Sequence, residues 1–120
     1  MDKKEVDDTW ERIAKNYEFV QGAQVSNSFI ILMALSESKE PLTTTQISEK
    51  IAVNSKGKLF KVSGALKDSL ENRLRKARYV TGVDMRQEGK KKPVRKTLYS
   101  ITLKGKKLLT GWIAFLSAFP

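Results

Sequence analysis

The chain has 120 residues, with 23 lysines and arginines, 13 aspartates and glutamates, and neither histidine nor cysteine. These missing residue types exclude Ser-His-Asp and Cys-His catalysis, disulfide bonds and thiolate zinc sites. The net charge of +10 comes from the segment after residue 55, where 17 basic residues oppose 4 acidic ones, whereas residues 1–55 carry 6 basic and 9 acidic residues. This asymmetry indicates a polyanionic partner, most often nucleic acid, and the alternative is a solvated lysine surface.

Length and hydropathy indicate one domain, residues 1–120, that does not enter a membrane. The longest apolar run, residues 29–35, is far shorter than the about 20 residues that cross a bilayer. The amino terminus is not followed by an apolar signal segment. We therefore expect a cytoplasmic protein, and the sequence suggests neither a metal nor a cofactor.

The first third of the chain is predicted to form two helices. Apolar side chains recur at helical spacing over residues 7–21, and Asp8 and Glu11 have the spacing of a capping box. The apolar stripe of this helix consists of Trp10, Ile13, Ala14, Tyr17 and Val20. The second helix, about residues 29–36, is apolar nearly all round, so we expect it to be buried.

A helix-turn-helix unit is predicted next. Thr43 and Gln46 form an S/T-x-x-Q capping box, which predicts a helix from Thr44 to about residue 53. Residues 54–57 have the composition of a turn. The following helix, residues 63–77, carries one apolar stripe that consists of Leu66, Leu70, Leu74 and Ala77.

The hydrophobic period then changes from helical to two. Residues 79–85 and 94–101 alternate, and the basic segment between them contains Gly and Pro, which predicts a β-hairpin with a long tip. A last helix is predicted from near Thr102 to the end of the chain. The expected fold is mainly α with a small β-hairpin (α+β): a winged helix-turn-helix over residues 26–101, with an extra helix at each end.

Residues 63–70 (SGALKDSL) and 97–105 (TLYSITLKG) carry a family resemblance. They resemble winged-helix transcriptional regulators of the PadR type, and MarR-like and other archaeal or bacterial winged-helix regulators are similar. The matching positions are Gly64, Leu66 and Leu70 in a Gly-x-Leu-x-x-x-Leu pattern, and Tyr99, Ile101, Thr102 and Gly105 in a Tyr-x-Ile/Leu-Thr-x-x-Gly pattern. The resemblance covers about residues 26–110 and implies a homodimeric transcriptional regulator.

The helix over residues 63–77 would enter the major groove of DNA with its first turns leading. Gly64 would let the backbone approach the duplex, Lys67 can donate to guanine, and Asp68 can accept from cytosine N4. The alternative for Lys67 is an ordinary solvated lysine. The DNA-binding residues expected from this unit are Thr44, Lys61, Ser63, Gly64, Lys67 and Asp68.

The hairpin is the stronger basic element. Over residues 86–96 it carries Arg86, Lys90, Lys91, Lys92, Arg95 and Lys96. A hairpin tip is thin enough to reach a minor groove or to follow the phosphate backbone. The alternative is that these lysines only keep an exposed hairpin soluble and unpaired.

Large apolar residues at the two ends of the chain suggest a dimer interface. They are Trp10, Tyr17, Trp112, Phe115, Leu116 and Phe119. The last four recur at helical spacing, so residues 102–120 are predicted to be a dimerisation helix. The alternative is packing of the first helix against the last within one chain.

The leading hypothesis from these features is a dimeric, nucleoid-associated transcriptional regulator that binds double-stranded DNA. Two alternatives remain: a winged helix that binds DNA or RNA nonspecifically, as a chromatin or ribosome-associated protein, and a winged helix that binds only protein. An enzyme is the least favoured class, because the sequence offers no histidine, no cysteine and no Gly-rich phosphate loop.

Overall fold

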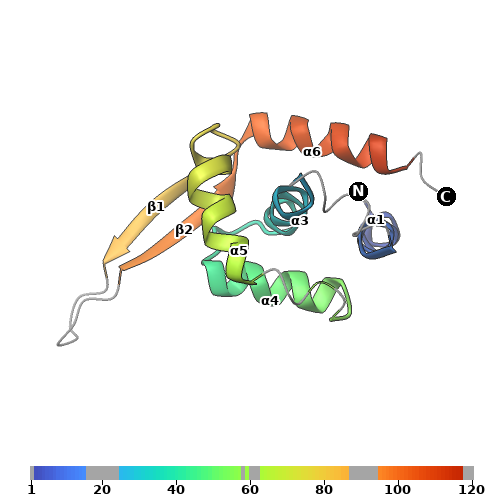
Figure 1. Cartoon of the computed structure of the whole chain (residues 1–120), viewed down its shortest axis with the longest axis horizontal. Helices are drawn as coiled ribbons and strands as arrows, with labels where there is room; N and C mark the ends of the chain where they lie inside the picture. Colours follow the sequence, from blue (N-terminus) through green and yellow to red (C-terminus); the bar gives the residue numbers. More distant parts are fainter. Residues whose placement is uncertain (1, 16–24, 58, 60–62, 87–94, 118–120) are drawn as a thin grey trace.

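A computed structural model of the chain describes residues 2–15, 25–57, 59, 63–86 and 95–117. The elements in chain order are α1 (Lys3–Lys15), α3 (Val25–Ser36), α4 (Thr44–Asn54), α5 (Ser63–Asp68), η2 (Ser69–Arg75), β1 (Val80–Arg86), β2 (Arg95–Ile101) and α6 (Leu103–Leu116). The prediction of a mainly helical chain with one antiparallel hairpin is confirmed. In Figure 1, α3 lies at the centre, with α6 above it, α4 below it, α1 on one side and the hairpin on the other.

Helix α3 forms the middle of the core because its sequence is apolar on every face. Each residue from Phe29 to Leu35 is at most 5% exposed. The other elements contribute their apolar stripes to the same core, among them Trp10, Ile47, Ile51, Leu66, Leu70, Leu74, Leu109 and Leu116. The buried second helix predicted from the sequence is therefore confirmed, although it begins earlier, at Val25.

The first helix begins at Lys3, instead of near residue 7. An earlier aspartate provides the cap: Asp2 Oδ1 accepts a hydrogen bond from the backbone N–H of Glu5 at 2.8 Å. Asp2 and Glu5 have the same spacing as Asp8 and Glu11, and the earlier pair is the one that starts the helix. The predicted end of this helix lies outside the described residues.

The single helix predicted over residues 63–77 is in fact an α-helical turn, α5, followed by the π-helix η2. The leucines of its stripe recur every four residues, and each such step over-rotates an α-helix of 3.6 residues per turn by about 40°. The wider i→i+5 turn compensates for this drift, and Leu66, Leu70 and Leu74 are all at most 3% exposed. Arg78, with φ of 64°, ends the segment in the left-handed conformation.

The hairpin pairs β1 with β2 in a register that runs from Val80 opposite Ile101 to Arg86 opposite Arg95. A further bridge, which the sequence did not indicate, joins Leu42 to Tyr99. The N–H of Leu42 donates to the Tyr99 carbonyl at 2.9 Å, and the N–H of Tyr99 donates back at 2.8 Å. The segment before α4 therefore lies along the free edge of β2.

Helix α6 begins where the sequence predicted, with Thr102 as its N-cap. The Thr102 hydroxyl donates to the Arg78 carbonyl at 2.7 Å and accepts from the N–H of Gly105 at 3.0 Å. A Cβ atom on Gly105 would lie 2.2 Å from the carbonyl oxygen of Tyr79. Only glycine permits this approach, so Gly105 lets the start of α6 pack against the backbone of Tyr79, between η2 and β1.

Candidate nucleic-acid interface

Three of the predicted DNA-binding residues line one hollow on the surface, between the start of α4, the end of α5 and the middle of β2. These residues are Thr44, Lys67 and Lys96, and the hollow has a volume of about 530 Å³. Its other lining residues are Thr43, Thr45, Gln46, Glu49, Thr97 and Tyr99. The structure thus brings together three residues that are distant in the sequence.

The start of α4 provides the polar floor of this hollow. The predicted capping box is confirmed: the Gln46 N–H donates to the Thr43 hydroxyl at 3.2 Å, and the Gln46 side chain accepts from the Thr43 N–H at 2.9 Å. The N–H groups of Thr44 and Thr45 have no acceptor one turn earlier within a helix. Together with the positive end of the helix dipole, they favour an anion at this position.

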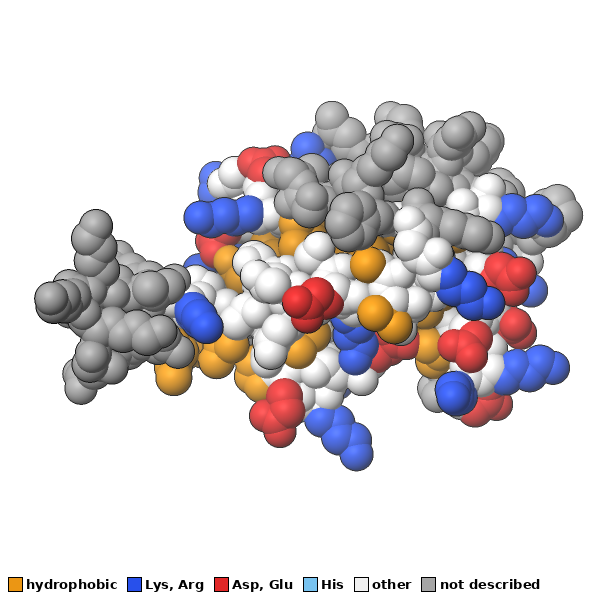
Figure 2. Space-filling model, turned by 90° about the horizontal axis from the view of Figure 1, so that it is seen from below, with side chains coloured by type: hydrophobic (Ala, Val, Ile, Leu, Met, Phe, Trp, Pro, Cys, Tyr) orange, Lys and Arg blue, Asp and Glu red, His pale blue; other side chains and the backbone are white. Residues whose placement is uncertain are grey.

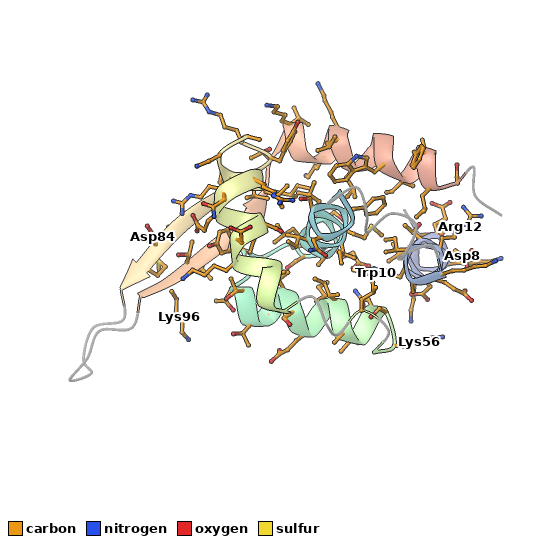
Figure 3. All side chains as sticks on the ribbon, viewed as in Figure 1. Asp8, Trp10, Arg12, Lys56, Asp84 and Lys96 are labelled. Atoms are coloured by element: carbon orange, nitrogen blue, oxygen red, sulfur yellow. The ribbon has the colours of Figure 1, made fainter. Side chains whose placement is uncertain are left out.

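Two lysines add positive charge to the hollow from different elements. Lys67 is exposed near the end of α5, and Lys96 is exposed on β2. Figure 3 shows Lys96 extending from the hairpin toward the side of α4, whereas Asp84 extends from the opposite side. Glu49 of α4 also lines the hollow, so the two lysines leave it with a net positive charge.

The other predicted DNA-binding residues divide into two groups. Ser63 and Gly64 begin α5, and Asp68 ends it and is exposed. Arg86 lies opposite Arg95, at the end of the strand ladder remote from Val80 and Ile101. The remaining predicted residues lie outside the described ranges; they are Lys61, Lys90, Lys91 and Lys92.

A polar cluster behind the hollow was missed by sequence reasoning. Tyr99 is 1% exposed, and its hydroxyl group donates a hydrogen bond to the Glu71 carboxylate of η2. Arg75 Nη1 lies 3.2 Å from both carboxylate oxygens of Glu71, and Arg75 Nη2 donates to the Gly82 carbonyl at 3.3 Å. Burial, reinforced by the Glu71 carboxylate, raises the pKa of Tyr99 to about 12.

The cluster joins η2 to both strands of the hairpin. The i,i+4 spacing of Glu71 and Arg75 is a signal that the sequence does carry. The link from Glu71 to Tyr99 crosses the fold and has no local signal. These side-chain contacts hold η2 against the hairpin. Of them, only the Glu71–Arg75 pair could be predicted from its spacing in the sequence.

A second cluster joins α1 to the end of α4. Glu37 Oε2 accepts from the Trp10 indole at 3.1 Å and from the Asn54 side-chain amide at 2.7 Å. Burial raises the pKa of Glu37, although these hydrogen bonds and the charge of Lys50 act in the opposite direction. This cluster lies at the end of α4 that is remote from the hollow.

The residues predicted for a dimer interface do not all lie on the surface. Trp10 and Leu116 are 1% and 3% exposed within this single chain. Their burial agrees with the alternative to a dimer interface, which was packing within one chain. Trp112 is partly buried and stacks on Phe29, with 5.5 Å between the ring centroids. Phe115 is 59% exposed, and Tyr17 and Phe119 lie outside the described residues.

No protein-family model, no curated protein and no solved structure matches this chain. Among the described helices, none is both long enough and apolar enough to span a membrane. Within the same ranges, no three His, Cys, Asp or Glu side chains are grouped so that they could hold a metal ion.

Proposed function

We propose that this chain is a winged-helix protein that binds double-stranded DNA and acts as a dimeric, nucleoid-associated transcriptional regulator. In this proposal α4, α5 and η2 are the helix-turn-helix unit, and the β1–β2 hairpin is the wing. The observation that carries the proposal is the hollow in which the start of α4, Lys67 and Lys96 converge. The +13 charge of residues 56–120 supports a polyanionic partner.

A backbone phosphate fits the chemistry of this hollow. It would accept from the N–H groups at the start of α4 and from the hydroxyl of Thr44, with Lys96 beside it. The phosphate would set the register of the protein on the duplex. The exposed Lys67, one turn into α5, would then reach a base edge in the adjacent major groove.

The hairpin would contact the next stretch of backbone or the minor groove. Arg86 and Arg95 are ladder partners at the end of the strand pair remote from Val80 and Ile101, so this end of the hairpin carries two basic residues. Such contacts position the protein and contribute affinity that depends on salt, but they carry little sequence information.

The test is duplex binding measured by fluorescence anisotropy over a range of KCl concentrations. Lys96→Ala should weaken binding on every sequence and flatten the log–log salt slope by about 0.9, the value for one lost phosphate contact. The matched control is Lys107→Ala, because Lys107 is also exposed but belongs to α6, on the opposite side of α3 from α4. Equal effects of the two substitutions would contradict the assignment of the hollow.

Sequence preference separates this proposal from the nonspecific alternative. Lys67→Ala should cost about 1–3 kcal/mol on a selected best site and much less on random duplex. Competition between the selected site and bulk DNA at one salt concentration measures the difference. A loss of equal size on both duplexes would make Lys67 a phosphate contact and would favour the nonspecific binder.

A further inference from the structure

A second group of exposed cations lies where η2 ends and α6 begins. Segments 72–83 and 95–117, which build this region, contain no aspartate or glutamate. We call the group the η2–α6 basic patch, and its four exposed members are Arg73, Lys76, Arg78 and Lys104. The patch therefore brings four positive charges together in segments that carry no negative one.

Hydrogen bonds join the two halves of the η2–α6 basic patch. Lys104 Nζ donates to the Ala77 carbonyl at 2.9 Å and lies 4.8 Å from the centre of the Tyr79 ring. The Arg78 carbonyl accepts from the hydroxyl of Thr102, the N-cap of α6. An ammonium group has three donors, so the contact with Ala77 leaves Lys104 able to donate to a ligand. These contacts fix Arg78 and Lys104 beside each other before any partner binds.

The acidic side chains nearest to the patch in the sequence are engaged elsewhere. Glu71 accepts from Tyr99 and is paired with Arg75, and Asp84 Oδ1 lies 4.0 Å from Arg75 Nη1. These contacts direct both carboxylates toward the hairpin rather than toward α6. Asp68 is at the other end of η2, where it is the N-cap.

The patch and the hollow lie on opposite sides of the fold. In Figure 1, α5 begins beside α4, whereas η2 ends beside the start of α6. The molecule measures 29 Å in the direction that separates α4 from α6. Figure 2, which views the side of α4, shows acidic and basic side chains interspersed there. A major groove is only about 8.5 Å deep, so a straight duplex held in the hollow does not reach the patch.

We propose that the η2–α6 basic patch binds the phosphate backbone of a second DNA duplex, so that the protein bridges two duplexes. This inference rests on the proposed function, which supplies the first duplex. Charge complementarity carries it, because a group of cations without acidic neighbours in its own segments fits a surface of repeated negative charges. Lysine and arginine bind backbone phosphates without reading base sequence, so the second duplex can have any sequence. Bridging would hold two stretches of DNA side by side.

The test is capture of a dye-labelled duplex by a biotinylated duplex on beads in the presence of the protein. Lys76→Gln with Arg78→Asn removes two of the four charges, and asparagine tolerates the left-handed conformation of Arg78. Capture should weaken at least about tenfold at low salt, and its log–log salt slope should become shallower by about 1.8, the value for two lost phosphate contacts. Anisotropy with a single duplex should give the parent affinity.

The matched control is Lys4→Gln with Lys56→Asn, which removes the same charge. Both lysines are exposed, and Lys56 has a φ of 55°, close to the 64° of Arg78. Lys4 belongs to α1, and Lys56 follows α4 at the end remote from the hairpin, as Figure 3 shows. This control should capture the second duplex as the parent does.

Leu103→Ser separates a second duplex from a protein partner. Leu103 is 70% exposed beside Lys104 at the start of α6. A protein partner would bury this side chain, whereas phosphate contacts depend on charge. The variant should therefore capture the second duplex as the parent does. If capture falls as far as in the double variant, a protein contact carries the bridging and the inference is wrong.

A parent that binds a single duplex but captures no second one would overturn this inference and leave the proposed function intact. Parent-like capture by the double variant would do the same, because a dimer with one duplex on each protomer would then explain the bridging. Equal losses of capture and of single-duplex affinity would place the patch on the first duplex and also overturn the inference. A parent that binds no duplex would overturn both proposals.

Discussion

At two places in this fold, one glutamate links neighbouring elements through side-chain hydrogen bonds. The two glutamates differ in the charge of the groups that contact them. At the amino-terminal junction, Glu37 accepts hydrogen bonds from Trp10 of α1 and Asn54 of α4. At the hairpin junction, Glu71 of η2 accepts from Tyr99 of β2 and is paired with Arg75. The donors that contact Glu37 are neutral, whereas Glu71 has a cation within 3.2 Å.

The difference indicates which part of the molecule is held more firmly. At the hairpin junction, Arg75 also reaches the backbone of β1, and the start of α6 packs directly on the backbone of Tyr79. At the amino-terminal junction, one half-buried carboxylate carries both hydrogen bonds. We therefore expect substitutions at the hairpin junction to cost more stability, and those at Glu37 to change mainly the pH dependence.

The largest effect is expected at the glycine beside Tyr79. Gly105→Ala forces a Cβ atom to within 2.2 Å of a backbone oxygen, which cannot move aside as a side chain would. The free energy of unfolding should fall by about 3 kcal/mol or more. Urea denaturation measures it, with Gly111→Ala as the control in the same helix.

Gly111 has no atom within 4 Å of the position where a Cβ would stand, so its substitution should stabilise α6 by up to about 1 kcal/mol. If both alanine variants unfold at the same urea concentration, α6 does not begin against Tyr79 in the way described.

Tyr99→Phe should have the second largest effect at neutral pH. It removes the hydroxyl that donates to Glu71 but keeps the buried ring, and we expect a loss of about 1–2 kcal/mol. The raised pKa also predicts an alkaline signature. The unfolded chain loses the Tyr99 proton near pH 10, before the folded chain does near pH 12, so the stability linked to this group is present below pH 10 and is lost as the pH rises to about 12.

The alkaline part of this prediction is measured by the stability of parent and variant between pH 9 and the alkaline limit. The parent should lose more stability than Tyr99→Phe over this range. Tyr79→Phe serves as the comparison, because Tyr79 makes no contact with Glu71 among those described and stacks under Lys104 instead. A steeper alkaline loss in Tyr99→Phe than in the parent would reverse the sign and refute the argument.

Arg75→Lys should have a smaller effect. A lysine cannot contact both Glu71 oxygens and the Gly82 carbonyl at once, because it lacks the planar fork of arginine. The side chains of Arg75 and Glu71 are 35% and 32% exposed, so water screens the pair and the loss of stability should stay below about 1 kcal/mol. Thermal unfolding followed by circular dichroism measures this loss, and a drop larger than that for Tyr99→Phe would contradict the ranking.

Glu37→Gln should have the smallest effect at pH 7, less than about 0.5 kcal/mol, because glutamine keeps an acceptor and is not penalised by burial of a charge. The raised pKa means that the folded parent binds the Glu37 proton more tightly than the unfolded chain. The Glu37 contribution to parent stability therefore increases as the pH falls from neutrality toward the ordinary glutamate range, and it is absent from the variant. Identical pH profiles for parent and variant would show that Glu37 is not desolvated.

Local rules were sufficient for the elements that carry their own signals. The capping box of Thr43 and Gln46, the period of two in the hairpin and the cap at Thr102 each involve residues within a few positions of one another. The same rules could not show that η2 is a π-helix, because a four-residue leucine repeat is also compatible with an α-helix. The hollow was predictable only as a set of basic residues, since its geometry depends on how α4, α5 and β2 meet.

The terminal aromatic residues show a second limit of sequence reasoning. A stripe of large apolar side chains predicts burial but does not tell whether the covering surface belongs to the same chain or to another. Trp10 and Leu116 find that cover within the chain, through the core around α3. Phe115, at 59% exposure, keeps the prediction of a dimer open to measurement by sedimentation.

The bridge between Leu42 and Tyr99 has a consequence for the order of folding. Helices α4 and α5, the π-helix and β1 all lie between these two residues in the chain, so their pairing closes a long loop. Loop closure costs chain entropy before the pair contributes, and contacts of this kind slow folding. A two-stranded hairpin is only marginally stable alone. We therefore expect the hairpin to become ordered together with the helices that this loop encloses, in one cooperative step. The helix-turn-helix unit and the hairpin, which the proposed function assigns to DNA binding, would then fold together.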